Sequence, residues 1–596
     1  MIITLKKTTD MKKIAILTLS VMVAFSSCNI LNNDPDDSFT KSNYFTSVEN
    51  VELFANYFYS AFSGYGNGGS YGEFYFNVLN DDQAVTGVEP WTFTQQMASS
   101  SAWSSPYSNI RRCNLLIEAI PTISSMSTVQ ANHWMGVSRL MRAWYHYKVV
   151  RGFGDCYWVN HVLDPKKDAD ILYGPRTDRD IVMDSILSDL NFAVENMTLY
   201  STSRTQFNQY VANAMKAEVC LYEGTFCKYR VEADGQKAPD AARSEKYLRE
   251  CCNACEVILN SGNYSLTPSY LAVYNSLNLE GNPEMILYKH YAYPTLGHST
   301  IDYTCGSTQV KGMTKDAFNS YLSADGELIA YGDDHGVLDA NGKPSVAAQI
   351  ARRDPRLGFQ VDGLLQFPGN DVVRFAGNDF AAKNASSSTS STGYGVLKFD
   401  TDQLDRVRRQ SIGQGDTDAP IFWLAVIYLN YAEAKAELGE FDNAIQGQTL
   451  DKLRARAGIL WGFDWSSVND PRAAALMPGI SQLIYEIRRE RRVELMYDIN
   501  DRYYALQRWH KLDLLDTEMH PDIKKGAWIG TAADDNKLFD VAAAELAGGS
   551  HPDVDADGYI DCSNGNTRIY HPKYYLFPIP NDQQTLNPEI GQNWGW

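Results

Sequence analysis

An acidic stretch near the C-terminus carries the pattern best suited to binding a metal ion. The oxygen donors that it would supply are those of Asp553, Asp555, Asp557 and Asp561 and the Tyr559 carbonyl. Carboxylates at alternate positions converge on one calcium ion in loops of this kind, and Gly558 allows the sharp turn. Asn564 stands where an EF-hand has its bidentate glutamate, so the stretch is not an EF-hand. The pattern leaves two interpretations open: a structural calcium loop or a solvated acidic turn.

Paired carboxylates occur in residues 481–512, a stretch that is rich in arginine and contains neither Pro nor Gly. Its length and periodicity predict one long helix. Glu490 and Glu494 could form a catalytic pair, but neighbouring arginines would hold both carboxylates ionised and occupied. We favour an internal ion-pair spine that fixes how other helices dock. Within it, we expect Arg491 to pair with Glu494, and Glu490 to pair with Arg489 or with a group from another helix.

Other catalytic and cofactor patterns are missing from the sequence. There is no HExxH motif and no Ser-His-Asp order, and the carboxylates are too numerous to nominate a glycosidase pair. The Gly-rich loop at residues 64–72 has no following Lys-Ser/Thr, which argues against a phosphate site. Cys251, Cys252 and Cys255 cluster without a nearby histidine, so we interpret them as buried or free thiols rather than metal ligands. We therefore expect no enzymatic activity.

The composition narrows the class of partner. The net charge of −19 over 596 residues argues against nucleic acid or anionic lipid as a main partner. The chain has 36 tyrosines and 12 tryptophans, and such rings fill cores but also stack on sugar faces and peptide side chains. The length and the aromatic content fit one large compact unit or two interleaved lobes.

The N-terminus has the features of a targeting segment. Met11 is followed by two lysines and then by an apolar run over residues 14–25, which is too short to span a bilayer. Small residues then precede Cys28, as in a lipobox, and the residues after it are polar and acidic. We predict a signal peptide over residues 1–27 that starts at Met11, and lipidation at Cys28. An ordinary signal with an incidental cysteine is the alternative.

Apolar periodicity predicts helices along most of the remaining chain. They cover residues 48–62, 108–120, 129–151, 176–197, 206–226, 243–260, 419–438 and 450–458. Between residues 267 and 418 this periodicity fades and Gly, Asn, Asp, Ser and Tyr become frequent. Loops on a rigid scaffold commonly carry recognition, so we expect this insert to face the ligand.

Four strings along the chain carry a family resemblance. The string IRRERRVELMYDINDRYYALQRW begins at Ile487, and SRLMRAWYHYKVVRGFGD begins at Ser138. They are similar to the C-terminal signature and to the second signature of the SusD/RagB family of nutrient-binding surface lipoproteins. RRDPRL from Arg352 and YLNYAEA from Tyr428 follow in the expected order. Trp423 stands where the family usually has arginine.

The resemblance implies a mainly α fold, with a tetratricopeptide-like helical scaffold and a large irregular, loop-rich insert lobe. The expected division of the chain is a signal peptide at 1–27, a lipidated tether at 28–47, an N-terminal helical scaffold with ligand-facing loops at 48–266, the insert lobe at 267–418, and a C-terminal helical scaffold with its tail at 419–596.

The resemblance also implies a function at the cell surface. Proteins of this family are anchored in the outer membrane, capture oligosaccharides and deliver them to a SusC-like TonB-dependent transporter. A peptide-binding lid of the RagB type is one alternative, and a structural or adhesive helical surface protein is another. The signature residues belong to the scaffold and do not identify the ligand.

Sugar rings need flat aromatic platforms with polar groups beside them. In the family, the loop after the acidic pair Asp81-Asp82 and the segment near residue 291 meet on one surface. The ligand-binding residues that we predict in these regions are Trp91, Tyr291 and Tyr293, with Trp103 as a weaker candidate and Asp82 and Asn80 as hydrogen-bond partners. Burial in the core is the alternative for each ring.

Overall fold

The computed structural model describes residues 44–198, 203–305, 311–329, 335–370, 390–459, 464–465, 470–499 and 501–596. Cys28, the signal peptide and most of the tether lie outside the described residues. Helices dominate the described chain, and the strands are short and paired two by two, so the prediction of a mainly α fold is confirmed. Among the described residues, none of the helices has the length and apolarity needed to cross a bilayer.

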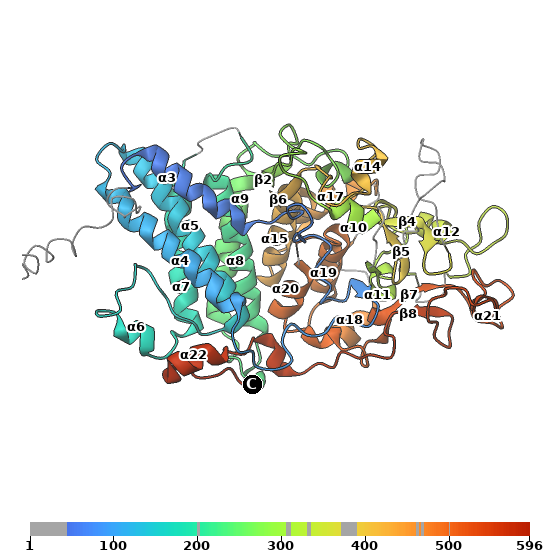
Figure 1. The fold of residues 1–596 in the computed structure, drawn as a ribbon. Helices are drawn as coiled ribbons and strands as arrows, with labels where there is room; N and C mark the ends of the chain where they lie inside the picture. Colours follow the sequence, from blue (N-terminus) through green and yellow to red (C-terminus); the bar gives the residue numbers. More distant parts are fainter. Residues whose placement is uncertain are drawn as a thin grey trace, which may run out of the picture.

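The N-terminal half is a stack of packed helices (Figure 1). Its α-helices are α3 Val48–Ala55, α4 Ser101–Ala119, α5 Thr128–Phe153, α6 Ala169–Tyr173, α7 Arg179–Asn196, α8 Gln209–Tyr229 and α9 Ala241–Leu259. Side chains fix where helices begin: Ser127 caps α5 and Asn208 caps α8. A Cβ at Gly224 would lie 2.7 Å from Leu248 Cγ, so glycine lets α8 and α9 approach closely.

Short elements replace the long helices between α9 and the C-terminal half. The helices there are α10 Thr300–Cys305, α11 Lys315–Phe318, α12 Val346–Ala351, α13 Arg356–Gln360 and α14 Arg406–Arg409. Four antiparallel strand pairs tie distant segments together: β1 Gln83–Val85 with β3 Lys311–Met313, β2 Met285–Lys289 with β6 Ala419–Trp423, β4 Val361–Gln366 with β5 Gly393–Val396, and β7 Lys525–Trp528 with β8 Tyr559–Asp561.

The C-terminal half returns to the helical stack. Its α-helices are α15 Leu424–Glu437, α16 Asn443–Gln448, α17 Leu450–Arg456, α18 Pro471–Leu476, α19 Gln482–Glu494, α20 Asp501–Arg508, α21 Val541–Leu546 and α22 Asn581–Leu586. In Figure 1, α15 and α20 lie beside α8 at the centre of the molecule, which closes a tetratricopeptide-like arrangement.

Four predicted helices differ from the structure. The helix expected over 108–120 already begins at Ser101, and the one expected over 48–62 is an α-helix only to Ala55 and continues as a 3-10 helix, Asn56–Ala61. The other two differ more. The helix expected over 419–438 begins as a strand, because the backbone of β6 pairs with β2 before α15 starts. The long helix expected over 481–512 is divided into α19 and α20. The backbone at Tyr497, between them, has a φ of 69°, a conformation that a helix does not contain.

The buried ion-pair spine predicted for α19 is confirmed, but the partners of Glu490, Glu494 and Arg491 come from other elements. Glu490 and Glu494 both contact the Arg356 guanidinium, at 2.6 and 2.9 Å. Arg491 pairs with Glu433 of α15 at 3.0 Å rather than within its own turn. The spine therefore ties α13 and α15 to α19, and both glutamates are occupied by arginine, which argues against the catalytic alternative.

Candidate functional site

Trp91, the first ring predicted to face the ligand, is buried with 6% of its surface exposed. Its indole Nε1 donates to the Ile569 carbonyl at 2.8 Å. Tyr574 stacks on the indole with ring centroids 4.5 Å apart. The prediction of an exposed Trp91 is wrong, because the C-terminal segment covers the loop that carries it.

Two further predicted rings also belong to the interior. Trp103 is buried on α4, where its ring meets the edge of Phe153 at 5.0 Å. Tyr291 is only 1% exposed, and its hydroxyl donates to the Gly66 carbonyl at 2.7 Å. Neither ring presents a free face, so neither offers a stacking platform. Tyr291 instead supports the Gly-rich loop at residues 64–72 from beneath.

Tyr293 is the one predicted ring that lies at the surface, with 42% of it exposed. The Arg408 guanidinium lies 5.0 Å from the ring centroid, and Arg408 pairs with Asp416 at 2.5 Å. One face of the ring is therefore covered by a cation held in place. A polar ligand could still reach the exposed part of the ring.

The predicted polar partners are structural. The Asn80 carboxamide oxygen accepts from the Asp82 and Gln83 backbone amides, each at 2.9 Å, and so shapes a turn. The buried Asp82 carboxylate pairs with Arg492 of α19 at 2.6 Å. Burial raises the pKa of Asp82, although Arg492 opposes that rise. Both side chains are committed to the scaffold and do not face a ligand.

The Gly-rich loop is held rigidly between two other loops. The Gly68 amide donates to the Gly297 carbonyl at 2.7 Å, and the Ser299 hydroxyl donates to the Gly68 carbonyl at 2.7 Å. The Gly413 amide donates to the same Ser299 hydroxyl at 2.8 Å. At Gly66, which has a φ of 89°, an added Cβ would lie 2.1 Å from the Ser70 carbonyl oxygen. The glycines therefore permit a compact loop on which exposed side chains keep fixed positions.

That loop presents an exposed tyrosine, Tyr71, which packs with two half-buried rings from outside the loop and was not predicted from the sequence. Tyr71 is 65% exposed and stacks on Phe76 with centroids 4.5 Å apart. The Tyr303 ring of α10 meets both rings edge-on, with its centroid 5.5 Å from that of Tyr71 and 5.7 Å from that of Phe76. The Lys311 ammonium lies 5.5 Å from the Phe76 centroid and donates to the Phe76 carbonyl at 2.9 Å. We call Tyr71, Phe76, Tyr303 and Lys311 the aromatic platform.

The platform has the chemistry of a site for sugar or peptide side chains. Stacked rings offer an apolar face to a partner, while the Lys311 ammonium and the tyrosine hydroxyls lie at its edge. Partial burial lowers the pKa of Lys311, and Glu89 opposes that change. The loop that carries Tyr71 was considered in the sequence only as a phosphate site, although an aromatic residue between glycines was the signal that could have revealed it.

The acidic stretch forms a hairpin in which two of the predicted ligands, the Asp555 carboxylate and the Tyr559 carbonyl, already have partners. The Asp555 carboxylate pairs with Lys525 at 2.6 Å and accepts from the Tyr559 amide at 2.9 Å. The Tyr559 carbonyl accepts from the Asp555 amide at 2.9 Å, and the Asp557 carbonyl accepts from Trp528 at 3.1 Å. The side chains of Asp553, Asp555, Asp557 and Asp561 are not among the described groups of ligand atoms that lie within 4.8 Å of one another. As arranged, these residues do not fit a calcium ion, and binding there stays a prediction.

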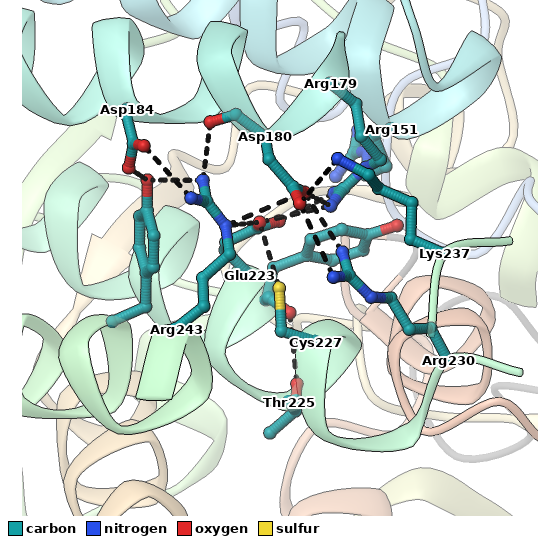
Figure 2. A network of polar contacts seen from close by, with 12 residues as sticks. Arg151, Arg179, Asp180, Asp184, Glu223, Thr225, Cys227, Arg230, Lys237 and Arg243 are labelled. Atoms are coloured by element: carbon teal, nitrogen blue, oxygen red, sulfur yellow. Dashed lines mark hydrogen bonds and ion pairs between the residues drawn. The ribbon is translucent and has the colours of Figure 1, made fainter. Parts of the chain in front are cut away.

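The described residues with clustered metal-ligand atoms are Asp180, Glu223 and Cys227, whose ligand atoms lie within 4.8 Å of one another. Figure 2 shows that basic side chains surround them. The ion pairs join Asp180 to Arg179, Arg230, Lys237 and Arg243, and Glu223 to Arg179 and Arg243. A metal cation would meet these positive charges, so the network instead ties α7, α8 and α9 together. Burial raises the pKa of Cys227, whose thiol donates to Glu223 at 3.2 Å.

A comparison with protein families identifies the fold. The profile of the SusD family matches residues 283–596, which is more than half of the chain. This chain belongs to the SusD family. A second profile, described as "Starch-binding associating with outer membrane", matches residues 33–221. The family resemblance predicted from the signature strings is confirmed.

Relatives of this SusD-family chain share limited identity with it. "SusD-like protein P25" of Formosa agariphila is 22% identical over 538 residues, which cover 84% of this chain and 90% of P25. "SusD-like protein P38" of the same organism is 26% identical over 229 residues, covering 36% of this chain and 43% of P38. A SusD-like protein of Bacteroides ovatus is 24% identical over 221 residues, covering 35% of this chain and 39% of that protein. The matches to P38 and to the B. ovatus protein thus span less than half of each.

Solved structures share the fold. A SusD-like carbohydrate-binding protein from Bacteroides fragilis superposes with a TM-score of 0.66 at 17% identity, over 92% of this chain and 100% of that one. A second SusD-like protein from B. fragilis superposes with a TM-score of 0.64 at 19% identity, over 95% of this chain and 100% of that one. A laminarin-binding SusD-like protein superposes with a TM-score of 0.53 at 18% identity, over 92% of this chain and 100% of that one. At these identities the likeness establishes the tetratricopeptide-like architecture and does not define a ligand.

Proposed function

We propose that this SusD-family chain is a surface glycan-binding lipoprotein that captures oligosaccharides through the aromatic platform. The observation that carries the proposal is the exposed Tyr71 ring, which stacks on the half-buried Phe76 and lies on a loop braced by two neighbouring loops. Rings held in this way present a flat apolar face without a large loss of side-chain freedom on binding. Two relatives in fold that are described as carbohydrate-binding and laminarin-binding support the choice of a glycan.

Delivery to a transporter is the second part of the proposal. The support for it is membership of the SusD family and the match to a profile described as associating with the outer membrane. We infer a lipid anchor at Cys28 and a SusC-like TonB-dependent barrel as partner. Purification of the tagged protein in mild detergent should bring down a large outer-membrane barrel. Recovery of the lipoprotein alone under several detergents would count against this part.

The ligand class is tested with the purified mature domain. A glycan array and a mixed-peptide binding assay are run side by side, with Tyr71→Ala as the test variant. We expect glycan binding that falls at least tenfold in Tyr71→Ala, because the exposed ring supplies the stacking surface. Tyr173→Ala is the matched control, since Tyr173 on α6 is also exposed but lies outside the platform.

Three results would change the assignment. Binding of peptides that depends on Tyr71 would make the chain a peptide-capturing protein. Glycan binding that Tyr71→Ala leaves intact would remove the platform from the site. Binding of neither ligand class would favour a structural or adhesive role.

A further inference from the structure

A cleft of about 620 Å³ lies between the helices at the centre of the molecule. Its walls come mostly from α4, α5, α8, α15 and α20. It opens to solvent, because Asn77, Ser101 and Ser105 line it and are exposed. No residue of the aromatic platform lines it. The cleft is therefore a separate feature, with a volume in the range of about 300–1,000 Å³ that is usual for small-molecule sites.

Arg151 of α5 lines the cleft and is held there by aromatic rings. Its guanidinium lies 3.3 Å from the Tyr504 ring centroid and 4.9 Å from that of Tyr147. Arg139 of the same helix pairs with Asp189 at 2.7 Å, whereas no carboxylate oxygen of the described residues lies within 4.0 Å of Arg151. The side chain is half-buried, and its nitrogens are not among the fully covered polar atoms that lack a partner. A molecule in the cleft can therefore contact the guanidinium.

Lys148 lies one turn before Arg151 on the same face of α5 and also lines the cleft. Its ammonium donates to the Ala61 carbonyl at 3.4 Å, a long hydrogen bond, and no carboxylate of the described residues lies within 4.0 Å of it. Burial lowers the pKa of Lys148, although Glu73 opposes that change. Two neighbouring cations in the cleft thus lack a contacting counter-charge, which is costly for partly buried groups.

Three other charged groups of the lining are committed to partners behind it. Arg491 and Arg508 both pair with Glu433, at 3.0 and 2.5 Å. The Asp498 carboxylate pairs with Lys398 at 2.6 Å. These groups hold the helices together, and none of them supplies a counter-charge to the two cations of α5.

Two further carboxylates line the cleft, those of Glu73 and Glu218. Glu73 accepts from the Gly64 amide at 3.3 Å, and burial raises the pKa of Glu73. Glu218 favours the charged forms of both α5 cations from more than 4.0 Å away. The lining thus has four basic and three acidic side chains, and the Glu433 and Lys398 partners behind it add one of each sign. One positive charge is left over, so an anion is favoured over a cation.

The remaining accessible lining is largely apolar. Tyr504, Phe577, Val426 and Ile499 line the cleft and are half-buried, so part of each side chain can be reached. A planar guanidinium binds a carboxylate through two parallel hydrogen bonds, and an ammonium beside it adds a third donor. Apolar walls around such a group favour a ligand with an apolar body.

We propose that this cleft binds a small monocarboxylate with an aromatic or other apolar body. The carboxylate would accept hydrogen bonds from Arg151 and Lys148, and the body would pack against Tyr504 and Phe577. The inference goes beyond the proposed function and does not rest on it, because it concerns a different surface and a different class of ligand.

Isothermal titration calorimetry of the mature chain compares 3-phenylpropanoate with 3-phenylpropanamide, which has the same body without the charge. We expect the carboxylate to bind at least about tenfold more tightly than the amide, and Arg151→Gln to lose that advantage. Arg139→Gln is the matched control, because Arg139 lies on the same helix but does not line the cleft. Circular dichroism melts show whether each variant remains folded.

A second pair of variants tests the location without changing a charge. Ser105→Trp places an indole at the mouth of the cleft and should weaken binding at least fivefold. Ser104→Trp should leave binding unchanged, because Ser104 is exposed on the same helix but does not line the cleft. Tyr71→Ala, which removes the main ring of the platform, should also leave it unchanged. This variant separates a failure of the cleft site from a failure of the platform.

An acidic sugar carries the same carboxylate on a polar ring, so D-glucuronate is titrated into Tyr71→Ala as a comparison. We expect it to bind more weakly than 3-phenylpropanoate, and equal affinities would overturn the requirement for an apolar body. Equal affinities of the wild type for 3-phenylpropanoate and its amide, or full binding in Arg151→Gln or Ser105→Trp, would overturn the anion site. No binding of 3-phenylpropanoate by the wild type would mean that water fills the cleft, and would also overturn the proposal.

Discussion

The Tyr291 hydroxyl donates to the Gly66 carbonyl at 2.7 Å, from a ring that is almost wholly buried. This hydrogen bond joins the segment after β2 to the Gly-rich loop, more than two hundred residues earlier in the chain. The sequence predicts that Tyr291 contacts a ligand. The structure instead makes it a positioning residue, because it supports the loop on which Tyr71 is exposed.

Replacing Tyr291 with phenylalanine should weaken ligand binding indirectly. The change leaves the Gly66 carbonyl without this donor, so the loop loses part of its support and Tyr71 must be ordered on binding. We expect a loss of glycan affinity of about threefold to tenfold and a loss of about 1 kcal/mol in the free energy of unfolding. Tyr575→Phe is the control, since it removes another buried tyrosine hydroxyl that accepts from the Leu512 amide. Equal affinities in both variants would show that the loop does not depend on Tyr291.

Trp91→Ala should reduce stability rather than affinity. The indole fills a buried space against Tyr574 and satisfies the Ile569 carbonyl, so removing it leaves a cavity and an unpaired acceptor. We expect the free energy of unfolding to fall by about 3–5 kcal/mol, with glycan binding intact in the folded fraction. Trp594→Ala, which removes a half-exposed ring, should cost far less. A large loss of affinity with an unchanged melting temperature would return Trp91 to the ligand site.

The helices could be predicted because their patterns are local. The predicted ranges for α5, α8 and α9 lie within a few residues of those in the structure, since apolar spacing and capping residues act over one or two turns. The spine of α19 was predictable for the same reason: arginines and glutamates on an apolar stripe must be paired. Their partners were not, because Arg356 and Glu433 come from other parts of the chain.

The placement of the rings depended on contacts that the sequence does not reveal. Trp91 is covered by Ile569, which is 478 residues away along the chain. The β6 strand forms because β2 offers a pairing edge, although the same residues have a helical pattern. A ring in a loop is exposed or buried according to which distant segment folds over it. The sequence therefore identified loop regions more reliably than the residues that face a ligand.

Cys28 is the residue on which membrane attachment is expected to depend. Lipidation requires its thiol, so Cys28→Ala should move the protein from the membrane fraction to the soluble fraction. The measurement is fractionation followed by a carbonate wash. Ser27→Ala keeps the cysteine and a small residue before it, and it should remain bound. Retention of Cys28→Ala on the membrane after the wash would show that the anchor lies elsewhere.

Calcium binding by the acidic hairpin is tested at Lys525. A calcium ion would have to displace this ammonium from Asp555, so Lys525→Met should lower the melting temperature and make calcium more stabilising. Melts of metal-stripped protein with calcium or with chelator provide the measurement. Lys537→Met, which breaks the pair with Asp540 outside the hairpin, is the control. If calcium and chelator give the same melt in Lys525→Met, the calcium assignment is withdrawn.

Glu433 links the spine to acid stability. Burial alone would raise the pKa of its carboxyl, but Arg508 and Arg491 lower it from 4.5 to about 2. Since the folded pKa is depressed, the stabilisation is complete above pH 4.5 and is lost as the pH falls toward 2. A pKa shift of this size corresponds to a contribution to the free energy of unfolding on the order of 3 kcal/mol at neutral pH. Asp498 acts in the opposite sense: burial raises its pKa to about 6 although Lys398 opposes this, so its contribution falls as the pH rises from about 4 to 6.

Comparing Glu433→Gln with the wild type isolates the glutamate, because the Asp498 contribution is common to both. We expect the variant to be less stable by about 3 kcal/mol or more at pH 7, since the Arg508 and Arg491 guanidinium groups lose a buried counter-charge. The difference should shrink as the pH falls from 5 to 3, because over this range the Glu433 carboxyl takes up a proton in the unfolded wild type while it stays ionised in the folded protein. Urea unfolding at several pH values gives both numbers, and Glu245→Gln, at an exposed ion pair with Arg249, should show neither effect. A constant difference between the two proteins across this range would mean that Glu433 does not carry the acid sensitivity.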